Sequence, residues 1–367
     1  MKSESGRKNL VVLIPTRNRH SRLGTTIDAA LALHGVAQDF NVNIVISDNS
    51  DDRNLILPIV DKLPVKVIFP PTVLSMSEHW DWAINSVSAD YYALITDRSL
   101  IMAEEFYGSL IALEKSKAEL VSHSFCGYND YRFPYLLGLL TYTKDLHLLS
   151  TADILAEAKQ ACFWSAFPRA MNCIFSNNLK NAIKSRYGRI FSGVAPDFNF
   201  ALKVCSEVPS FLFHDVPGFM SVAGNLSNGR SYSTGTAGGN ADFNRMSLSE
   251  GVLATPFPHS KLPINIILHE CCSVIDGFAY SYSAYENAII RTLGNLSNTG
   301  VKYSLESLPE SFRAKLQNCE RSEVRRLFRN LFFYRRFPTF LASYPIAMSL
   351  ARHLSLTCSN IDRRFCF

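Results

Sequence analysis

Short apolar runs alternate with helical patterns through the first half of the chain. Residues 10–14 form an uninterrupted apolar run, and residues 21–33 then carry apolar side chains on one helical face. Further strands are expected at 43–47, 65–69, 91–95, 120–123 and 211–213, and further helices at 77–87 and 104–117. Because parallel strands need crossover connections, this alternation predicts an α/β fold with a mainly parallel sheet and flanking helices.

Polar clusters follow three of the expected strands. They are Thr16-Arg17-Asn18-Arg19, Asp48-Asn49-Ser50-Asp51-Asp52 and Asp97-Arg98-Ser99. In open α/β sheets, ligands bind beyond the carboxyl ends of the strands, so we expect these clusters to meet in one site. The first cluster lacks the glycines of a dinucleotide fingerprint or a P-loop, which argues against those nucleotide sites. Arg17 and Arg19 either hold phosphate or are ordinary surface arginines.

Composition narrows the class of protein. The chain has 367 residues, 47% hydrophobic and 19% charged, which is typical of folded protein in one large domain or two ordinary ones. The net charge of +5 is mild, and no zinc-finger, homeodomain or RNA-recognition signature is present, so we expect no nucleic-acid partner. The nine cysteines show no paired spacing, which predicts reduced thiols.

Neither a signal peptide nor a membrane span is expected. The apolar run at residues 10–14 is too short for a signal-peptide core, and no apolar stretch is long enough to cross a bilayer. We therefore expect a cytoplasmic protein, with peripheral attachment to the inner face of the cell membrane left open.

A stretch rich in glycine, serine and asparagine at residues 223–239 divides the chain. It is equally well interpreted as a linker or as a mobile loop that closes over a substrate. From about residue 260 the pattern is mostly helical. We expect an α/β domain over residues 1–235 and a mostly helical region over residues 236–367.

Four segments, in order along the chain, carry a resemblance to a known family. They are VVLIPTRNR at 11–19, NIVISDNSDD at 43–52, LSMSEHWDWAINSVSADYYALITDRSL at 74–100 and SGVAPDFNFALKV at 192–204. Across roughly residues 8–235 the chain resembles glycosyltransferase family 2, of the bacterial surface-polysaccharide type. The resemblance implies the Rossmann-like GT-A fold. It also implies an inverting enzyme that moves a sugar from a nucleotide-diphosphate donor to a saccharide or lipid-linked glycan.

The resemblance also implies roles on the donor side. Asp48 would contact the nucleotide base, since a carboxylate accepts a base N–H; the alternative is a local turn. Asp97 matches the first aspartate of the diphosphate motif, but Ser99 stands where a metal-binding aspartate is usual. A hydroxyl is a poorer ligand for Mg²⁺ or Mn²⁺ than a carboxylate. Our hypothesis is weakened or lost metal dependence, with Arg98 partly offsetting the diphosphate charge, while a divalent cation remains open.

Further donor-side residues are expected around these. We place Thr16, Arg17, Asn18, Ser50, Glu78, His79 and Arg230 at the donor. Arg230 lies in the glycine-rich stretch and would reach phosphate on closure, or is a surface arginine. His214 is either a metal or diphosphate ligand or a structural histidine. Asp81 either reaches the donor sugar or phosphates or is part of a solvated helix face, and we favour the solvated face.

Asp197 follows Pro196 at the start of an expected helix. The plain interpretation is an aspartate held by N–H groups of the first turn. The resemblance implies a general base that deprotonates the acceptor hydroxyl. One carboxylate suffices because diphosphate is already a good leaving group, unlike the leaving groups of glycosidases.

A basic amphipathic helix is expected at residues 323–337. It either packs on the protein's own core or docks on an anionic membrane that carries a lipid-linked acceptor. Two other functions also stay open. One is transfer of a different nucleotide-activated group, or of a nucleotidyl group, on the same fold. The other is a non-catalytic glycan- or nucleotide-binding member with a degenerate Asp97-Arg98-Ser99 motif.

Overall fold

The computed structural model describes residues 6–124, 126–129, 136–137, 142–163, 166–223, 253, 255–256 and 262–297. Almost all of the glycine-rich stretch, with Arg230, and the expected basic helix at 323–337 lie outside the described residues. The main elements are β1 (Lys8–Thr16), α1 (His20–Leu31), α2 (Leu33–Val36), β2 (Phe40–Asp48), α3 (Leu57–Val60), β3 (Val65–Ile68), α4 (Met76–Asn85), β4 (Tyr91–Leu94), β5 (Ser99–Ile101), α5 (Ala103–Lys115), β6 (Leu120–His123), β7 (Cys126–Asn129), β8 (Leu136–Leu137), β9 (Leu146–Ser150), α6 (Thr151–Lys159), the short 3-10 helix η3 (Ala170–Asn172), β10 (Cys173–Ser176), α7 (Asn177–Tyr187), α8 (Pro196–Glu207), β11 (Ser210–His214), β12 (Phe219–Ala223), α11 (Pro263–Val274) and α12 (Tyr282–Ser297).

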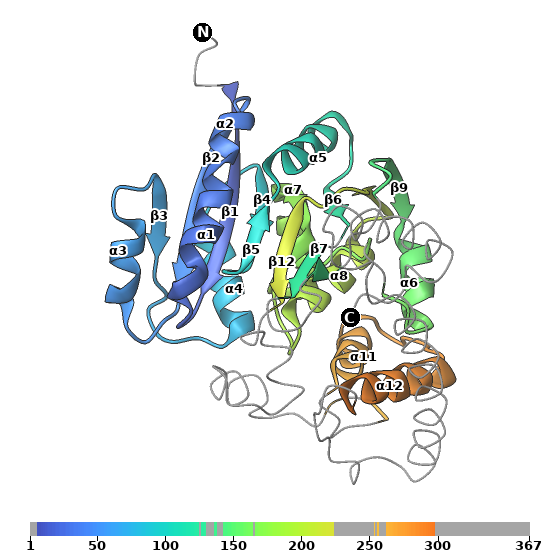
Figure 1. Ribbon diagram of the computed structural model, residues 1–367. Coiled ribbons are helices and arrows are strands. Elements are labelled where there is room, and N and C mark those ends of the chain that lie inside the picture. Colours follow the sequence, from blue (N-terminus) through green and yellow to red (C-terminus); the bar gives the residue numbers. More distant parts are fainter. Residues whose placement is uncertain are drawn as a thin grey trace, which may run out of the picture.

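One large sheet dominates the fold. Its eight strands run in the order β3-β2-β1-β4-β10-β6-β11-β9. All are parallel to one another except β10 and β9, which pair antiparallel with their neighbours. This confirms the predicted α/β class with a mainly parallel sheet. Figure 1 shows β1 and β2 side by side, with their carboxyl ends toward α4.

Both faces of the sheet are buried, as the continuous apolar runs predict. Successive residues of a strand point to opposite faces. Leu10 and Val12 of β1 share a buried cluster with α1 and α5. Val11 and Leu13 belong to a second cluster, with residues of α4, α7 and α8. The sheet is therefore sandwiched between two helical layers, and its polar positions are confined to the strand ends.

A smaller sheet begins just after the fourth parallel strand. It runs in the order β5-β12-β7-β8, and Ser99 of β5 pairs with Ser221 of β12. Asp97 and Arg98 thus occupy the connection between β4 of the large sheet and β5 of the small one.

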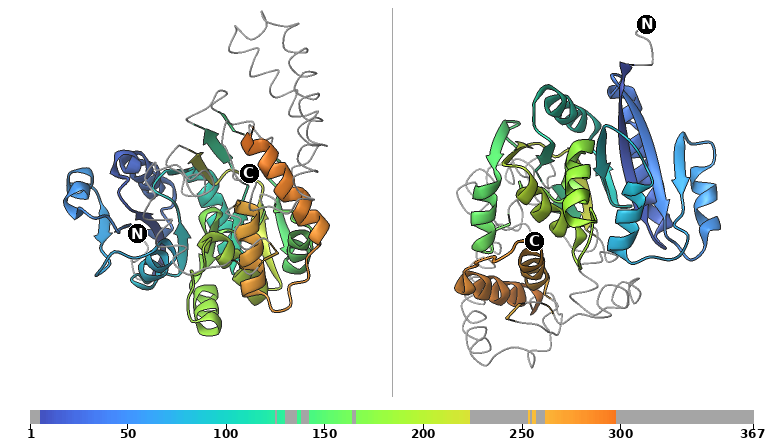
Figure 2. Two further views of the ribbon diagram at one scale, coloured as in Figure 1. Left: turned by 90° about the horizontal axis from the view of Figure 1, so that it is seen from below. Right: turned by 180° about the vertical axis from the view of Figure 1, so that it is seen from behind.

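Helices α11 and α12 pack on the same core as the sheet. Leu268 and Cys271 of α11 and Tyr285 of α12 are buried in the cluster that contains Leu13 of β1 and Phe200 of α8. Figures 1 and 2 show both helices beside the end of the molecule where the parallel strands finish. Residues 262–297 therefore add to the main core, while the division near residue 235 stays a prediction.

Within the part of the chain that the structure describes, none of the helices combines the length and the apolar character that crossing a bilayer requires.

Candidate functional site

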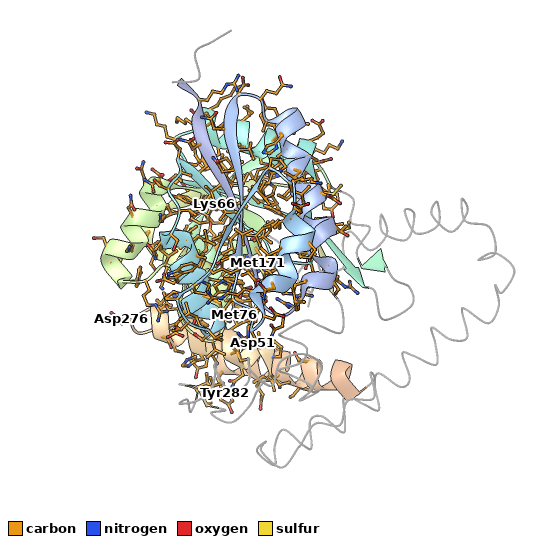
Figure 3. All side chains as sticks on the ribbon, turned by 90° about the vertical axis from the view of Figure 1, so that its left-hand side faces the viewer. Asp51, Lys66, Met76, Met171, Asp276 and Tyr282 are labelled. Atoms are coloured by element: carbon orange, nitrogen blue, oxygen red, sulfur yellow. The ribbon has the colours of Figure 1, made fainter. Side chains whose placement is uncertain are left out.

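The polar loops that follow β1, β2 and β4 are joined by hydrogen bonds. We call residues 16–19, 48–51 and 97–99 the strand-end cluster. The Thr16 hydroxyl donates to Asp97 at 2.8 Å, and the Asn49 N–H donates to the Thr16 carbonyl at 3.0 Å. Figure 3 shows Asp51, after β2, and Met76, after β3, at the same end of the sheet. The predicted convergence of the three polar segments is therefore present.

Asp97 is the most deeply buried charge of this cluster apart from Asp48, at 1% exposed. Its Oδ2 accepts from Thr16 and from Arg19 Nε, the latter at 2.9 Å. Its other oxygen, Oδ1, is buried with no partner among the described residues. A buried carboxylate oxygen without a donor costs free energy, so this atom is suited to accept from a ligand that enters the site.

The described residues do not fit a divalent cation well. Mg²⁺ and Mn²⁺ take several hard oxygen ligands. Here the Ser99 hydroxyl is hydrogen-bonded to Thr96 Oγ1 at 2.7 Å, and Arg19 already occupies one oxygen of Asp97. Among the described residues, no three His, Cys, Asp or Glu side chains are grouped to hold a metal ion. One carboxylate oxygen beside an arginine suits an anionic ligand with its own donors better than a bare cation.

His214 does not join Asp97. It ends β11, which lies three strand positions from β4 in the sheet, or about 14 Å at the usual strand spacing. Its Nδ1 is hydrogen-bonded to the Ser109 hydroxyl of α5 at 2.7 Å, and burial lowers its pKa. Strand order separates His214 from Asp97, and His214 has a partner within the protein, so the structure gives no support to a shared metal ion. A metal or diphosphate contact by His214 stays a prediction.

Asp48 is buried at the end of β2 and has partners on both carboxylate oxygens. Oδ1 accepts the Ser50 N–H at 2.9 Å, and Oδ2 lies 3.3 Å from His20 Nε2. The Ser50 contact is the local turn that the sequence left open as an alternative. A contact between Asp48 and a nucleotide base stays a prediction.

Arg17 and Asn18 tie the first polar loop to the second. Arg17 donates to the Asn49 carbonyl at 2.8 Å and to Asp51 at 3.2 Å, and Asn18 Nδ2 donates to Asp51 at 2.7 Å. The Asn18 N–H donates to Ser50 Oγ at 2.7 Å, and its φ of 53° lies in the left-handed region that asparagine tolerates. These hydrogen bonds hold the first two polar loops together, while Arg19 pairs with the buried carboxylate of Asp97.

Glu78 and His79, predicted to face the donor, both have partners within the protein. Glu78 forms a capping box with Ser75 at the start of α4, and the Ser75 hydrogen bonds lower its pKa. The ring of His79 is buried and lies 2.7 Å from the Ser47 hydroxyl; desolvation lowers its pKa to about 3. His79 is therefore neutral at ordinary pH, and it connects α4 to the end of β2. Ligand contact by either residue stays a prediction.

Asp81 corrects an expectation. It was interpreted as part of a solvated helix face, but its Oδ1 accepts the N–H groups of Ile190 and Phe191 at 2.7 and 3.1 Å. Arg189 lies 3.7 Å from its other oxygen. The side chain is covered because the segment before α8 folds back over α4, a contact that helical periodicity does not reveal.

Asp197 lies in the first turn of α8, after Pro196, as predicted. The side chain is partly buried, and burial raises its pKa against the opposing effects of Arg169 and nearby N–H groups. Arg169 stacks over the ring of Phe198 with its guanidinium 5.4 Å from the ring centre. A carboxylate with a raised pKa is a stronger base than an ordinary aspartate.

The antiparallel strand β10 brings Arg169 to the same edge of the sheet as Asp97. Ile174 of β10 pairs with Ala93 of β4, so the antiparallel strand begins beside the carboxyl end of β4. Arg169 and η3 directly precede β10 and so lie at that edge, with Asp197 near enough to Arg169 to feel its charge. The two carboxylates singled out from sequence thus lie near the same edge of the sheet.

Arg169 and Glu270 are residues that sequence reasoning missed. Glu270 is completely buried and accepts the N–H groups of Val194 and Ala195, just before Asp197. Its signal was the single carboxylate within the mainly apolar helix Pro263–Val274. Arg169 had no comparable signal, because its role depends on where β10 inserts.

Comparisons with known proteins give only distant likenesses. No protein-family model matches the sequence, and no curated protein matches it. Among solved structures, residues 1–349 of S. aureus TarS in complex with UDP are similar, with 13% identity and a TM-score of 0.45 over 81% of this chain and 73% of that one. The same TarS fragment without UDP gives 15% identity and 0.44 over 83% and 82%. TarS itself gives 14% identity and 0.44 over 83% of this chain and 50% of TarS. At this level the likeness says nothing of substrate or mechanism.

Proposed function

We propose that this protein transfers a sugar from a nucleoside-diphosphate donor to a hydroxyl of a saccharide or lipid-linked glycan, with inversion at the anomeric carbon. One observation carries the proposal. A partly buried aspartate with a raised pKa, Asp197, lies at the same sheet edge as a buried Asp97–Arg19 pair whose second carboxylate oxygen has no partner among the described residues.

The reaction assigned to Asp197 is general-base catalysis. The acceptor oxygen attacks the anomeric carbon while its proton passes to the Asp197 carboxylate. The bond from that carbon to the diphosphate oxygen breaks, and the diphosphate leaves with the electron pair. The raised pKa of Asp197 lies closer to the operating pH than that of an ordinary aspartate, and a general base is most effective when the two are close.

The strand-end cluster is the proposed donor site. Asp48 would receive the base, and the diphosphate would lie by Arg19 and Arg98, with a sugar hydroxyl donating to Asp97 Oδ1. Because Arg19 already pairs with Asp97 and Ser99 replaces a carboxylate, positive side chains would take over much of the charge neutralisation that a cation otherwise supplies. Reduced metal dependence follows from this assignment.

The acceptor side is assigned to the region beyond residue 235. A lipid-linked acceptor of surface polysaccharide synthesis would bring the enzyme to the cytoplasmic face of a membrane. The basic helix expected at 323–337 supports this assignment from sequence alone. Sedimentation with anionic and neutral liposomes tests it, and equal recovery from both would contradict it.

The function itself is tested with a panel of UDP-, GDP-, CDP- and dTDP-sugars. We expect one donor to release its nucleoside diphosphate, with release accelerated by a glycan acceptor. Nucleotide binding without release or transfer would favour the non-catalytic alternative. Transfer of a nucleotidyl group, with pyrophosphate released, would favour the nucleotidyltransferase alternative.

A further inference from the structure

We infer that Glu270 of α11 is a positioning residue for Asp197: it closes a buried hydrogen-bond chain that fixes the segment leading into α8. The inference rests on the proposed function for the role of Asp197. The chain itself is defined by contacts among described residues and extends that function to the C-terminal helices.

Glu270 binds the backbone immediately before the catalytic helix. Its Oε1 accepts the Val194 N–H at 2.6 Å and the Ala195 N–H at 2.8 Å. Its Oε2 accepts Asn199 Nδ2 of α8 at 2.8 Å. Three N–H donors on one buried carboxylate fix both the turn before Asp197 and the first turns of its helix.

Gly193 shows how closely this segment approaches the carboxylate. Its φ of 77° is in the left-handed region, and a β-carbon there would overlap the carboxylate oxygens of Glu270. Glycine is needed at this position both for its backbone conformation and for the space it leaves. The backbone at Gly193 is therefore in direct contact with the Glu270 carboxylate.

From Asn199 the chain continues to a buried ammonium. The Ser192 hydroxyl donates to Asn199 Oδ1 at 2.9 Å, and Lys203 Nζ donates to Ser192 Oγ at 2.7 Å and to the Arg189 carbonyl at 3.0 Å. Every bond points the same way, from Lys203 through Ser192 and Asn199 to Glu270. Burial lowers the pKa of Lys203 to about 8 and raises that of Glu270 to about 7.

Three helices thus hold one segment. Asp81 of α4 binds the N–H groups of residues 190 and 191, Lys203 of α8 binds carbonyls of 189 and 190, and Glu270 of α11 binds the N–H groups of 194 and 195. We call residues 189–197 with these side chains the Asp197 platform. Since a misplacement of about 1 Å at a reacting group costs as much as 100-fold in rate, such a platform matters more for catalysis than for substrate affinity.

The test is an isosteric swap of the central amide and carboxylate. Glu270→Gln sets an NH₂ group against the NH₂ of Asn199 or turns its carbonyl away from the Val194 and Ala195 N–H groups. Asn199→Asp sets two carboxylates face to face. The double variant restores the bonds around position 270, because the amide introduced there would donate to the carboxylate introduced at position 199 while its carbonyl still accepts both backbone N–H groups. The Ser192 hydroxyl can still donate to that new carboxylate.

We expect each single variant to lower kcat by more than about tenfold with the donor KM within about twofold, and the double variant to recover most of kcat. Melting temperatures identify any variant that loses activity through unfolding. Ser273→Ala is the matched control on α11, since this exposed hydroxyl bonds within its own helix, and it should behave as wild type. A single Glu270→Gln variant with wild-type kcat, or a double variant no better than the singles, would overturn the inference.

A second readout separates this inference from the proposed function. Hydrogen exchange of residues 189–197 should accelerate in each single variant and slow again in the double variant. If wild type turns over no donor, the proposed function fails, and the exchange pattern alone decides whether Glu270 holds this segment. Unchanged exchange in Glu270→Gln contradicts the inference whatever the activity.

Discussion

The strand-end cluster and the Asp197 platform place their carboxylates by different means. Asp97 follows β4 and is fixed by Thr16, at the end of the adjacent parallel strand β1, and by Arg19 in the loop after that strand. Asp197 sits on a helix whose leading segment is held by α4, α8 and α11. The position of Asp97 follows mainly from the order of the strands, whereas the position of Asp197 depends on helices distant in sequence. Perturbing the platform should therefore affect rate and long-range packing, and perturbing the cluster should affect donor binding.

The largest expected effect is on kcat, from substitution of Asp197 in the platform. Asp197→Asn keeps the shape of the side chain but removes the base, so kcat should fall by about 10²–10⁴-fold, the usual contribution of a general base. Donor KM should stay close to wild type, because the donor is assigned to the other region. Steady-state kinetics with the donor found in the panel measures both quantities. A folded variant that transfers sugar at nearly the wild-type rate would refute the role of Asp197.

The next effect is on stability and belongs to Glu270. Its pKa rises on folding from 4.5 to about 7, so the native state binds more protons than the unfolded chain between those values. Stability from this group is therefore present below pH 4.5 and lost as pH rises to about 7, by an amount of about 3 kcal/mol.

Urea unfolding of wild type and Glu270→Gln at several pH values between about 4.5 and 8 isolates this contribution. The difference in unfolding free energy should fall as pH rises and then level off. Comparing two proteins is necessary because burial lowers the pKa of His79 and of His123 to about 3, and these act in the opposite direction. A difference that is independent of pH would contradict an ionisable Glu270 inside the platform.

A smaller effect is expected in the strand-end cluster. Arg19→Ala leaves the buried Asp97 without its ion-pair partner. We expect the free energy of unfolding to fall by about 2 kcal/mol, which is below the range for buried pairs because the Arg19 side chain is 20% exposed. The double variant Arg19→Ala/Asp97→Asn should regain part of the lost stability, because it no longer buries an unpaired charge. Arg7→Ala, at an exposed arginine just before β1, is the matched control. Thermal unfolding measures all four proteins, and equal losses of stability for Arg19 and Arg7 would show that the pair is not stabilising.

The smallest effect is expected from chelation. With Arg19 on Asp97 and Ser99 bonded to Thr96, EDTA should lower the transfer rate by no more than about twofold. The measurement is the transfer rate before and after EDTA, with Mn²⁺ added back. If EDTA abolishes transfer and Mn²⁺ restores it, a metal ion binds at the strand-end cluster and this prediction is wrong.

Prediction from sequence succeeded where structure is local. The apolar run at residues 10–14 lies within β1, the run at 91–95 covers β4, and the helix expected at 77–87 overlaps α4. The convergence of polar loops followed from the parallel sheet. Strand β10 was not predicted, because its four residues lie between two helical segments and pair antiparallel with strands distant in sequence.

The misses at the site have the same physical origin. Glu270 contacts residues 75 and 76 positions away, and Asp81 contacts residues 109 and 110 positions away. The periodicity of apolar residues in the sequence does not reveal contacts across such separations. His214 was named beside Asp97 as a possible metal ligand from the family resemblance, and the order of the strands, which the sequence did not reveal, separates the two residues.

The configuration of the transferred sugar tests the central claim most directly. Proton NMR of the product made from the active donor identifies the anomeric configuration. A single base, Asp197, opposite the departing diphosphate predicts the configuration opposite to that of the donor. Retention of the donor configuration would contradict the proposed mechanism, because direct attack by a deprotonated acceptor inverts the carbon.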